Sequence, residues 1–242
     1  MYVKGMAETL MRPGDLSCAR VLPVAASFLQ SMNHSSMNTI GGSGKIMQSK
    51  QRFEKVITAS GHMIDAPDRA EPRFPPEKEH AVRDHIAQAL EGWQVGDRDL
   101  GVCGAARGAD ILFAERCLER GAHVRLLIAY PEEEFLDRSV RLNTGNWVER
   151  YFALRNHRNV ETLFQHERSE QPAGDLDPFE SDNLWIIETA REEACTGKLY
   201  AVLVWDEKSS ADGPGGTSHF AKQIEKLGGE ICIVNPTKLQ SQ

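Results

Sequence analysis

The chain has 242 residues, of which 40% are hydrophobic and 26% are charged, and it carries a formal net charge of −7. This composition is that of an ordinary globular protein, and the length allows one large domain, or one domain with an appendage. The first 50 residues hold five basic and two acidic side chains, so the acidic charge lies in the remainder. An acidic body is a poor match for duplex nucleic acid or an anionic membrane, and we expect neither as a partner.

The cysteines, histidines and apolar runs indicate the cellular compartment and the absence of bound metal. The five cysteines are scattered without a C-x-x-C pair, which predicts reduced core thiols. No apolar run approaches the roughly 20 residues of a membrane span, and Val21–Leu29 is interrupted by Pro23 and lacks a clear cleavage site. His80 and His85 have no third ligand at a suitable spacing and are predicted to lie on the surface. We therefore expect a cytoplasmic protein without a metal site or a resident cofactor.

Residues 1–52 differ in composition from the rest of the chain. They are rich in Met, Ser, Asn and Gly and show weak periodicity, which predicts a poorly ordered N-terminal extension. Gly44-Lys45 is reminiscent of a P-loop, but Thr39 stands where that motif needs its first glycine, and Ile46 where it needs Ser or Thr. The globular domain is therefore predicted for residues 53–242.

From Phe53 onward, short apolar runs alternate with helical patterns. Strands are predicted at residues 55–60, 100–103, 123–129, 160–164, 199–205 and 231–234. Helices are predicted to begin near residues 75, 109, 131, 146, 177 and 217. The run Leu199–Trp205 is nearly all apolar, as is typical of a central parallel strand covered on both faces. This alternation predicts an α/β fold, a doubly wound, mostly parallel Rossmann-like sheet flanked by helices.

One strand-to-helix loop has the features of a phosphate site. The strand at residues 100–103 ends at the loop Gly104-Ala105-Ala106-Arg107-Gly108, which leads into a helix from Ala109. Its glycines let a ligand approach the backbone, and the N–H groups and dipole of the helix start favour an anion. Arg107 adds a guanidinium that suits phosphate oxygens. The spacing matches neither the dinucleotide nor the P-loop fingerprint, so a plain tight turn is the alternative.

Two further loops are predicted at the same edge of the sheet. Ser60-Gly61-His62-Met63-Ile64-Asp65 follows the first strand, and a glycine-rich loop, Gly213-Pro214-Gly215-Gly216-Thr217, follows Asp206. Parallel strands end at one common edge, where ligands of such folds bind. Thr217 is predicted as a helix N-cap whose hydroxyl can also face a ligand. The coincidence of these loops favours a nucleotide-like site.

Together these three loops resemble the SLOG superfamily, over about residues 54–236. This superfamily includes Lonely-guy-type phosphoribohydrolases ("lysine decarboxylase-like" proteins), the DNA-processing protein A fold and sensor domains of bacterial conflict systems. The chain is most similar to the bacterial, signalling-associated branch. The resemblance implies a Rossmann-like sheet that binds a nucleotide or a nucleotide-derived ligand over its glycine loops.

The sequence departs from the enzymes of that superfamily at one informative position. Lonely-guy enzymes carry P-G-G-x-G-T-x-x-E, whose glutamate assists cleavage of an N-glycosidic bond. Here Lys222 stands at the glutamate position, or Phe220 if Thr217 is aligned with the motif threonine. Neither side chain accepts a proton as a carboxylate does, so that mechanism is not expected.

Our first hypothesis is a nucleotide-binding or sensing module, acting in signalling through self-association or a separate effector protein. In it, backbone amides and Arg107 hold phosphate, and Asp65 or Asp110 accepts hydrogen bonds from ribose hydroxyls. The residues expected to contact the ligand are Ser60, Gly61, His62, Asp65, Gly104, Ala105, Arg107, Gly108, Ala109, Asp110, Gly215, Gly216 and Thr217.

The second hypothesis is an enzyme that cleaves the N-glycosidic bond of a nucleotide. Asp65, Asp110 or Asp206 would replace the missing glutamate, and His62 or His219 would lie near the bond. Each of these residues also has an ordinary structural explanation, such as capping a helix or satisfying loop amides. A third reading is a protein-interaction domain with vestigial loops.

Overall fold

In a computed structural model of the chain, the residues that the structure describes are 53–167, 178–194, 198–208 and 216–240. The predicted N-terminal extension, the predicted helix start at Asp177 and the loop glycines Gly213 and Gly215 lie outside these ranges. The strands are β1 (Val56–Gly61), β2 (Leu100–Cys103), β3 (His123–Ile128), β4 (Val160–Phe164), β5 (Leu199–Val204) and β6 (Glu230–Val234). The main helices are α1 (Glu79–Gly92), α2 (Ala109–Glu119), α3 (Glu132–Phe135), α4 (Trp147–Arg155), α5 (Pro178–Glu193) and α6 (Thr217–Lys226).

The six strands form one parallel sheet in the order β4-β3-β2-β1-β5-β6, which confirms the predicted fold class. β1 lies in the middle and pairs in register with both neighbours, with Val56 opposite Leu100 of β2 and Leu199 of β5. The chain builds the sheet outward from β1 to β4, and then crosses back to add β5 and β6 on the other side of β1. A Rossmann-like, doubly wound α/β fold results.

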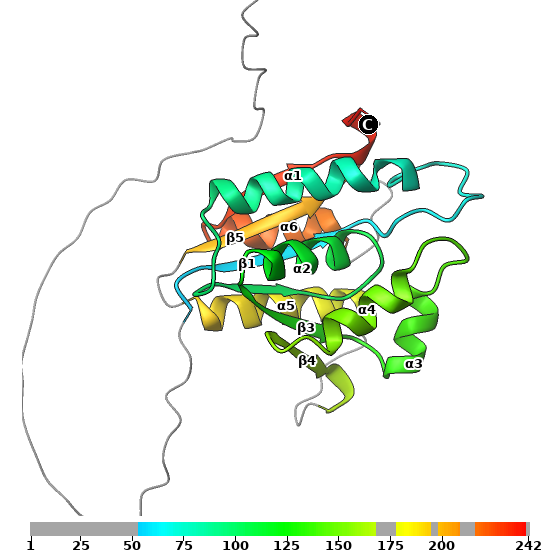
Figure 1. The fold of residues 1–242 in the computed structure, drawn as a ribbon. Coiled ribbons are helices and arrows are strands. Elements are labelled where there is room, and N and C mark those ends of the chain that lie inside the picture. The colour runs from blue at the N-terminus through cyan, green and yellow to red at the C-terminus, as the bar shows by residue number, and fades with distance from the viewer. Residues whose placement is uncertain (1–52, 168–177, 195–197, 209–215, 241–242) are drawn as a thin grey trace, which may run out of the picture.

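Helices cover both faces of the sheet (Figure 1). α1 and α2 lie in front of the sheet in that view, while α5 and α6 lie behind it. Each interface has its own apolar core, one packed under α1, α2 and α4 and the other under α5 and α6. β5 contributes to both cores because five of its six residues are buried, as expected of a strand covered on two faces.

The predicted boundaries shift by a residue or two, for identifiable reasons. β1 begins at Val56 instead of residue 55. The main chain and side chain of Lys55 both bond to the buried carboxylate of Asp99. Thr217 is the first residue of α6 rather than its N-cap; the N-cap is Gly216, which has no side chain to bond the helix amides. A π-helical turn, η2 (Leu136–Val140), continues α3 and was not foreseen.

Candidate functional site

The topology places a switch point at the carboxyl edge of the sheet, between β1 and β5. These strands are neighbours, but the chain leaves β1 toward α1 on one face and leaves β5 toward α6 on the other. Ligands of open α/β sheets bind where the connections diverge in this way. The strands β1, β2 and β5 all end at this edge, so the loops that follow them begin side by side, as the sequence predicted.

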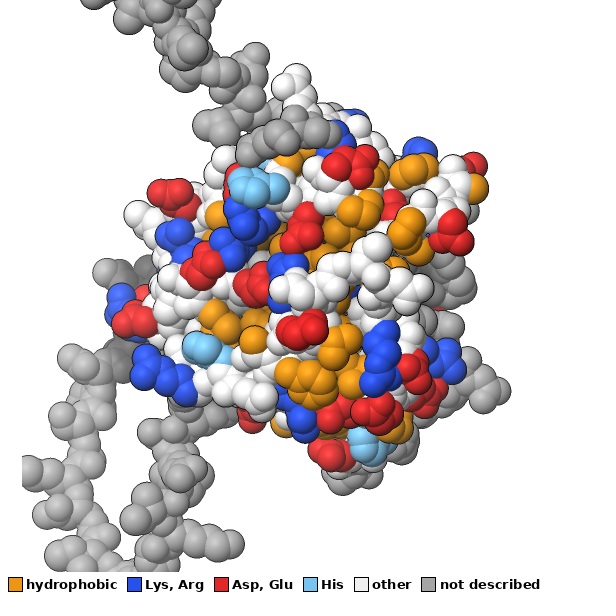
Figure 2. All heavy atoms as spheres, turned by 45° about the vertical axis from the view of Figure 1, so that its right-hand side comes forward, with side chains coloured by type: hydrophobic (Ala, Val, Ile, Leu, Met, Phe, Trp, Pro, Cys, Tyr) orange, Lys and Arg blue, Asp and Glu red, His pale blue; other side chains and the backbone are white. Residues whose placement is uncertain are grey.

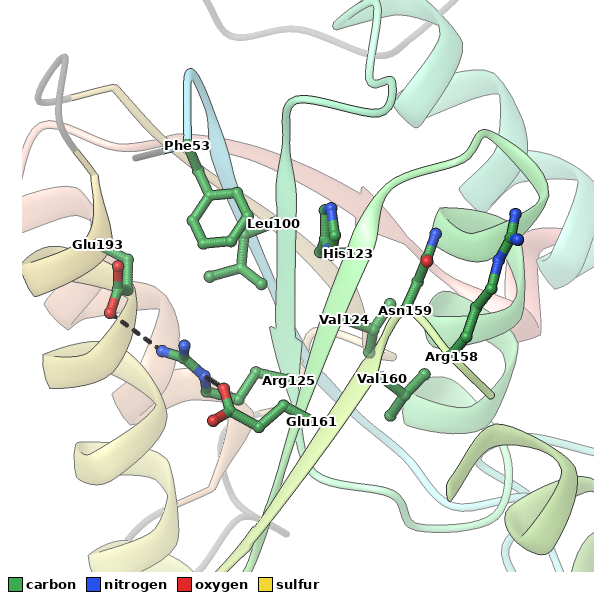
Figure 3. A pocket seen from close by; sticks show the side chains of 10 residues that line it. All are labelled: Phe53, Leu100, His123, Val124, Arg125, Arg158, Asn159, Val160, Glu161 and Glu193. Carbon is green, nitrogen blue, oxygen red and sulfur yellow. Dashed lines mark hydrogen bonds and ion pairs between the residues drawn. The ribbon is translucent and has the colours of Figure 1, made fainter. Parts of the chain in front are cut away.

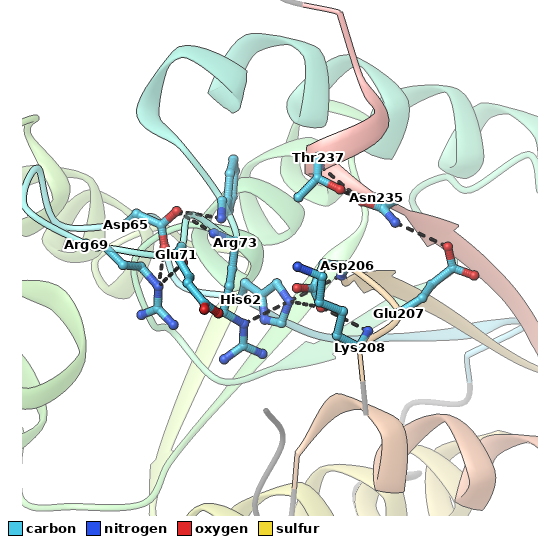
Figure 4. A network of polar contacts seen from close by, with 11 residues as sticks. His62, Asp65, Arg69, Glu71, Arg73, Asp206, Glu207, Lys208, Asn235 and Thr237 are labelled. Carbon is cyan, nitrogen blue, oxygen red and sulfur yellow. Dashed lines mark hydrogen bonds and ion pairs between the residues drawn. The ribbon is translucent and has the colours of Figure 1, made fainter. Parts of the chain in front are cut away.

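A buried polar network joins the loops after β1 and β5 (Figure 4). His62 and Asp206 are each about 6% exposed, and the Nε2 atom of His62 lies 3.1 Å from Oδ1 of Asp206. The Asp206 amide and Nε of Arg73 lie 3.2 and 3.3 Å from the same nitrogen. Nε2 donates to Oδ1 of Asp206 when it carries a proton and accepts from these N–H groups when it does not. Burial alone would raise the pKa of Asp206, but the bonds to His62 and to the Lys208 amide, with the charge of Arg73, hold it below its usual value. Asp206 is therefore a carboxylate that joins the two loops.

Asp65 organises the loop in which it lies. Its Oδ2 atom accepts hydrogen bonds from the amides of Arg73 and Phe74, both at 2.8 Å, and its Oδ1 atom pairs with Arg69 at 3.2 Å. The side chain is only about 5% exposed. Both oxygens thus hold the loop after β1 in shape, which leaves little capacity for the predicted contact with ribose.

The loop between β2 and α2 uses several of its amides within the protein. The amide of Ala106 donates to Oδ2 of Asp110 at 3.2 Å, and that of Arg107 donates to the Ser139 carbonyl at 2.9 Å. The Ala109 amide donates to the His62 carbonyl at 3.3 Å. The amides of Gly104, Ala105 and Gly108 make no hydrogen bond to any residue that the structure describes. The predicted phosphate cradle therefore reduces to these three amides and the Arg107 side chain.

Glycines at this edge allow close approach within the protein itself. Gly108 has φ of 95°, and a Cβ atom there would lie 2.5 Å from the Ile64 nitrogen, because Gly108 bridges to Met63 across the two loops. A Cβ at Gly61 would lie 2.5 Å from the Val204 carbonyl oxygen. These glycines let the ends of β1, β2 and β5 pack closely together. The sequence analysis had instead expected the glycines of this edge to let a ligand approach the backbone.

Arg107 is a basic group of the site that has no counter-charge among the described residues. Within the described ranges, no carboxylate forms an ion pair with it, and its Nε atom is buried without a hydrogen-bond partner. Burial lowers the pKa of this guanidinium, which nevertheless stays charged at neutral pH. The hydroxyl of neighbouring Ser139 is also buried without a partner. A buried arginine nitrogen without a partner is uncommon and calls for an anion or a water.

A pair of carboxyl groups flanks the end of β2. Asp110 lies in the first turn of α2. Asp182, which the sequence analysis missed, lies in the second turn of α5 on the opposite face of the sheet. Burial raises the pKa of Asp110 to about 7. Burial, together with the charge of Asp110, raises the pKa of Asp182 as well. Only the polar start of the predicted helix near residue 177 hinted that Asp182 belongs to this edge.

Only the end of the second glycine loop, from Gly216 onward, belongs to the described residues. Gly216 precedes α6, Thr217 is buried at about 6% exposure, and Gly215 falls outside the described ranges. His219 lies 3.0 Å from the Gln223 side chain in the same helix, and its Nδ1 atom is buried without a described partner. Contacts of Gly215, Gly216 and Thr217 with a ligand remain predictions.

A pocket of about 320 Å³ lies at the opposite, amino-terminal edge of the sheet (Figure 3). It is lined by Phe53, Leu100, His123, Val124, Arg125, Arg158, Asn159, Val160, Glu161 and Glu193. Arg125 within it is neutralised by Glu161, at 2.6 Å, and by Glu193, at 3.1 Å. This pocket is separate from the loops that the topology brings together.

The surface view turned toward the carboxyl edge shows acidic and basic side chains interspersed with apolar ones (Figure 2). Charge of one sign does not dominate this face, so a bound anion depends on particular residues. Among the described residues, no helix has the length and apolarity needed to cross a membrane. The same residues contain no cluster of three or more His, Cys, Asp or Glu side chains that could hold a metal ion.

The fold and this edge define a Rossmann-like α/β protein with a polar site at the carboxyl ends of its central strands. No protein-family profile matches the chain, and no curated protein is significantly similar to it in sequence. The structure is similar to DNA processing protein A from Streptococcus pneumoniae, with a TM-score of 0.39 and 17% identity over 74% of this chain. That match spans 49%, about half, of the Streptococcus chain. A second similar structure is the Moco carrier protein from Chlamydomonas reinhardtii, with a TM-score of 0.35, 13% identity, and coverage of 75% of this chain and 76% of that one.

Proposed function

We propose that the protein binds a nucleotide or a nucleotide-derived ligand at the carboxyl edge of the sheet, with a phosphate at Arg107. The observation that carries the proposal is the buried Nε atom of Arg107, which has no partner among the described residues. The free amides of Ala105 and Gly108 lie in the same loop and supply further donors. Charge-assisted bonds to phosphate would satisfy all three groups.

The remaining parts of the site suit a small molecule better than a macromolecule. The loops after β1 and β2 are tied together by the Met63–Gly108 bridge, and those after β1 and β5 by His62 and Asp206, so the edge is preformed. Preformed sites at such switch points are typical of nucleotide ligands. We extend the proposal to a sensing role in the cytoplasm, exerted through self-association or a separate effector, and to membership of the SLOG superfamily. Duplex DNA is not proposed as a partner.

The second candidate function is hydrolysis of the N-glycosidic bond of the bound nucleotide. It is favoured by one observation: Asp110, with a pKa of about 7, is partly protonated at neutral pH and could deliver that proton as a general acid. Of the other carboxylates considered for this role, Asp65 is engaged with loop amides and Asp206 with His62. Asp110 is therefore the acid that this candidate requires.

The test is proton NMR of AMP, ADP, ATP, NAD, ADP-ribose and cyclic nucleotides with the full chain. We expect line broadening of at least one nucleotide, and a loss of affinity of about 10- to 100-fold in Arg107→Ala, because charged hydrogen bonds contribute about 1.5–3 kcal/mol. Arg98→Ala, at an exposed arginine before β2, is the matched control and should leave binding unchanged. Free base or ribose phosphate appearing in the spectra would establish the hydrolase instead, and no effect on any ligand would contradict both functions.

A further inference from the structure

The carboxyl groups of Asp110 and Asp182 approach the same point of the backbone. A Cβ atom on Gly104 would lie 2.7 Å from Oδ2 of Asp110 and 3.8 Å from Oδ2 of Asp182. The absence of a side chain at Gly104 therefore gives the Asp110 carboxyl group room at the end of β2, and the Asp182 carboxyl group lies within van der Waals distance of the same point. The two side chains come from helices on opposite faces of the sheet, so the fold itself brings them together.

Neither carboxyl group has the partners that a buried anion needs. Oδ2 of Asp110 accepts one hydrogen bond, from the Ala106 amide. Oδ1 of Asp182 is buried and has no hydrogen-bond partner among the described residues, and no described cation pairs with either group. Because the residue as a whole is only partly buried, this acceptor can be reached from outside and points to a polar group that is bound there.

The surroundings of the pair keep a proton on it at neutral pH. The titratable groups facing it from the packed elements are the two carboxyl groups themselves, from α2 and α5, and the Cys103 thiol of β2. Burial, with the charges of Asp110, Cys117 and Asp182, raises the pKa of that thiol, so Cys103 remains neutral and adds no charge to the pair. Two neighbouring acids without a described cation do not both ionise readily, so one of them keeps its proton more easily when the other is ionised.

We propose that Asp110 and Asp182 form a sugar-binding pair, in which one carboxyl group contacts each of two adjacent hydroxyls of a ribose phosphate. The ionised member accepts a hydrogen bond from one hydroxyl, and the protonated member donates one to the other. This inference rests on the proposed function, because the phosphate of the same ligand is assigned to Arg107 in the loop that joins Gly104 to Asp110. It adds the class of ligand: a phosphorylated sugar with neighbouring hydroxyls.

The direct test compares ribose 5-phosphate with 2-deoxyribose 5-phosphate, by ligand-observed NMR titration of the full chain. We expect the wild type to bind ribose 5-phosphate at least about tenfold more tightly, since a site built around a hydroxyl leaves polar groups unpaired when that hydroxyl is missing. Equal affinity for the two sugars overturns the pair as a sugar site, even if both bind in a manner that depends on Arg107. If neither sugar phosphate nor any nucleotide binds, the proposed function itself has failed.

Two variants at Asp182 separate recognition from packing. Asp182→Ala should lose the discrimination between the two sugars while keeping the contribution of Arg107 to phosphate binding. Asp182→Asn retains an amide that donates like the protonated acid, so it should preserve the discrimination between the two sugars. Glu188→Gln, at an exposed position of the same helix, is the control. Unchanged discrimination in a folded Asp182→Ala protein, verified by its amide NMR spectrum, would overturn the inference.

Discussion

The buried carboxyl group of Asp110 makes the stability of the fold depend on pH. Burial raises its pKa from the usual 3.8 to about 7 in the folded protein. The unfolded chain releases this proton near pH 4 and the folded protein near pH 7, so the folded state binds more protons in between. Stability therefore falls as the pH rises from about 4 to about 7. A pKa difference of this size sets an upper bound of about 4 kcal/mol on the loss.

Asp110→Asn removes this ionisation and keeps a side-chain oxygen that can accept the bond from the Ala106 amide. We expect its free energy of unfolding, measured with urea, to rise relative to the wild type by roughly 2–3 kcal/mol more at pH 8 than at pH 5. Glu188→Gln removes an exposed carboxylate from α5 and should change stability equally at both pH values. The reasoning would be refuted if Asp110→Asn changed the free energy of unfolding equally at both pH values, or lowered it more at pH 8 than at pH 5.

Two other predictions concern the way the loops are joined. Gly108→Ala should lower the free energy of unfolding by about 2–4 kcal/mol, because φ is positive there and the new methyl group meets the backbone of the loop after β1; Gly92→Ala, with open space around it, should stay within about 1 kcal/mol of the wild type in the same urea titration. His62→Ala should destabilise the protein more at pH 7 than at pH 3. The depressed pKa of Asp206 means that its bond to His62 stabilises the fold above the usual carboxyl pKa and is lost on acidification; equal destabilisation at both pH values would contradict that role.

The sheet was predictable from the sequence because its strands are short apolar runs separated by turn signals. β2 and β4 have the predicted bounds, and the other strands differ by one or two residues at an end. The order of the strands was not predictable, since pairing of β1 with β5 depends on a crossover that leaves no local signal. The π-helical turn η2 was missed because its residues also fit an ordinary α-helix.

The site was predictable as a set of loops but not as a set of roles. Asp182 pairs with Asp110 only because α2 and α5 pack on opposite faces of one sheet, a relation that spacing along the chain does not encode. The sequence likewise could not show that the Asp65 carboxylate accepts hydrogen bonds from amides of its own loop. Nor could it show that the Ile64 backbone lies too close to Gly108 for any side chain to fit there. That no described carboxylate pairs with Arg107 is a property of its three-dimensional surroundings.

The most direct test of the central claim is the NMR signal of the Arg107 Nε–H group during titration of the full chain with ribose 5-phosphate. The account predicts that this signal shifts on saturation, together with the amides of Ala105 and Gly108, because phosphate supplies the acceptor that these groups lack. Shifts confined to the pocket at the other edge, around Arg158 and Asn159, with Arg107 unmoved, would contradict it.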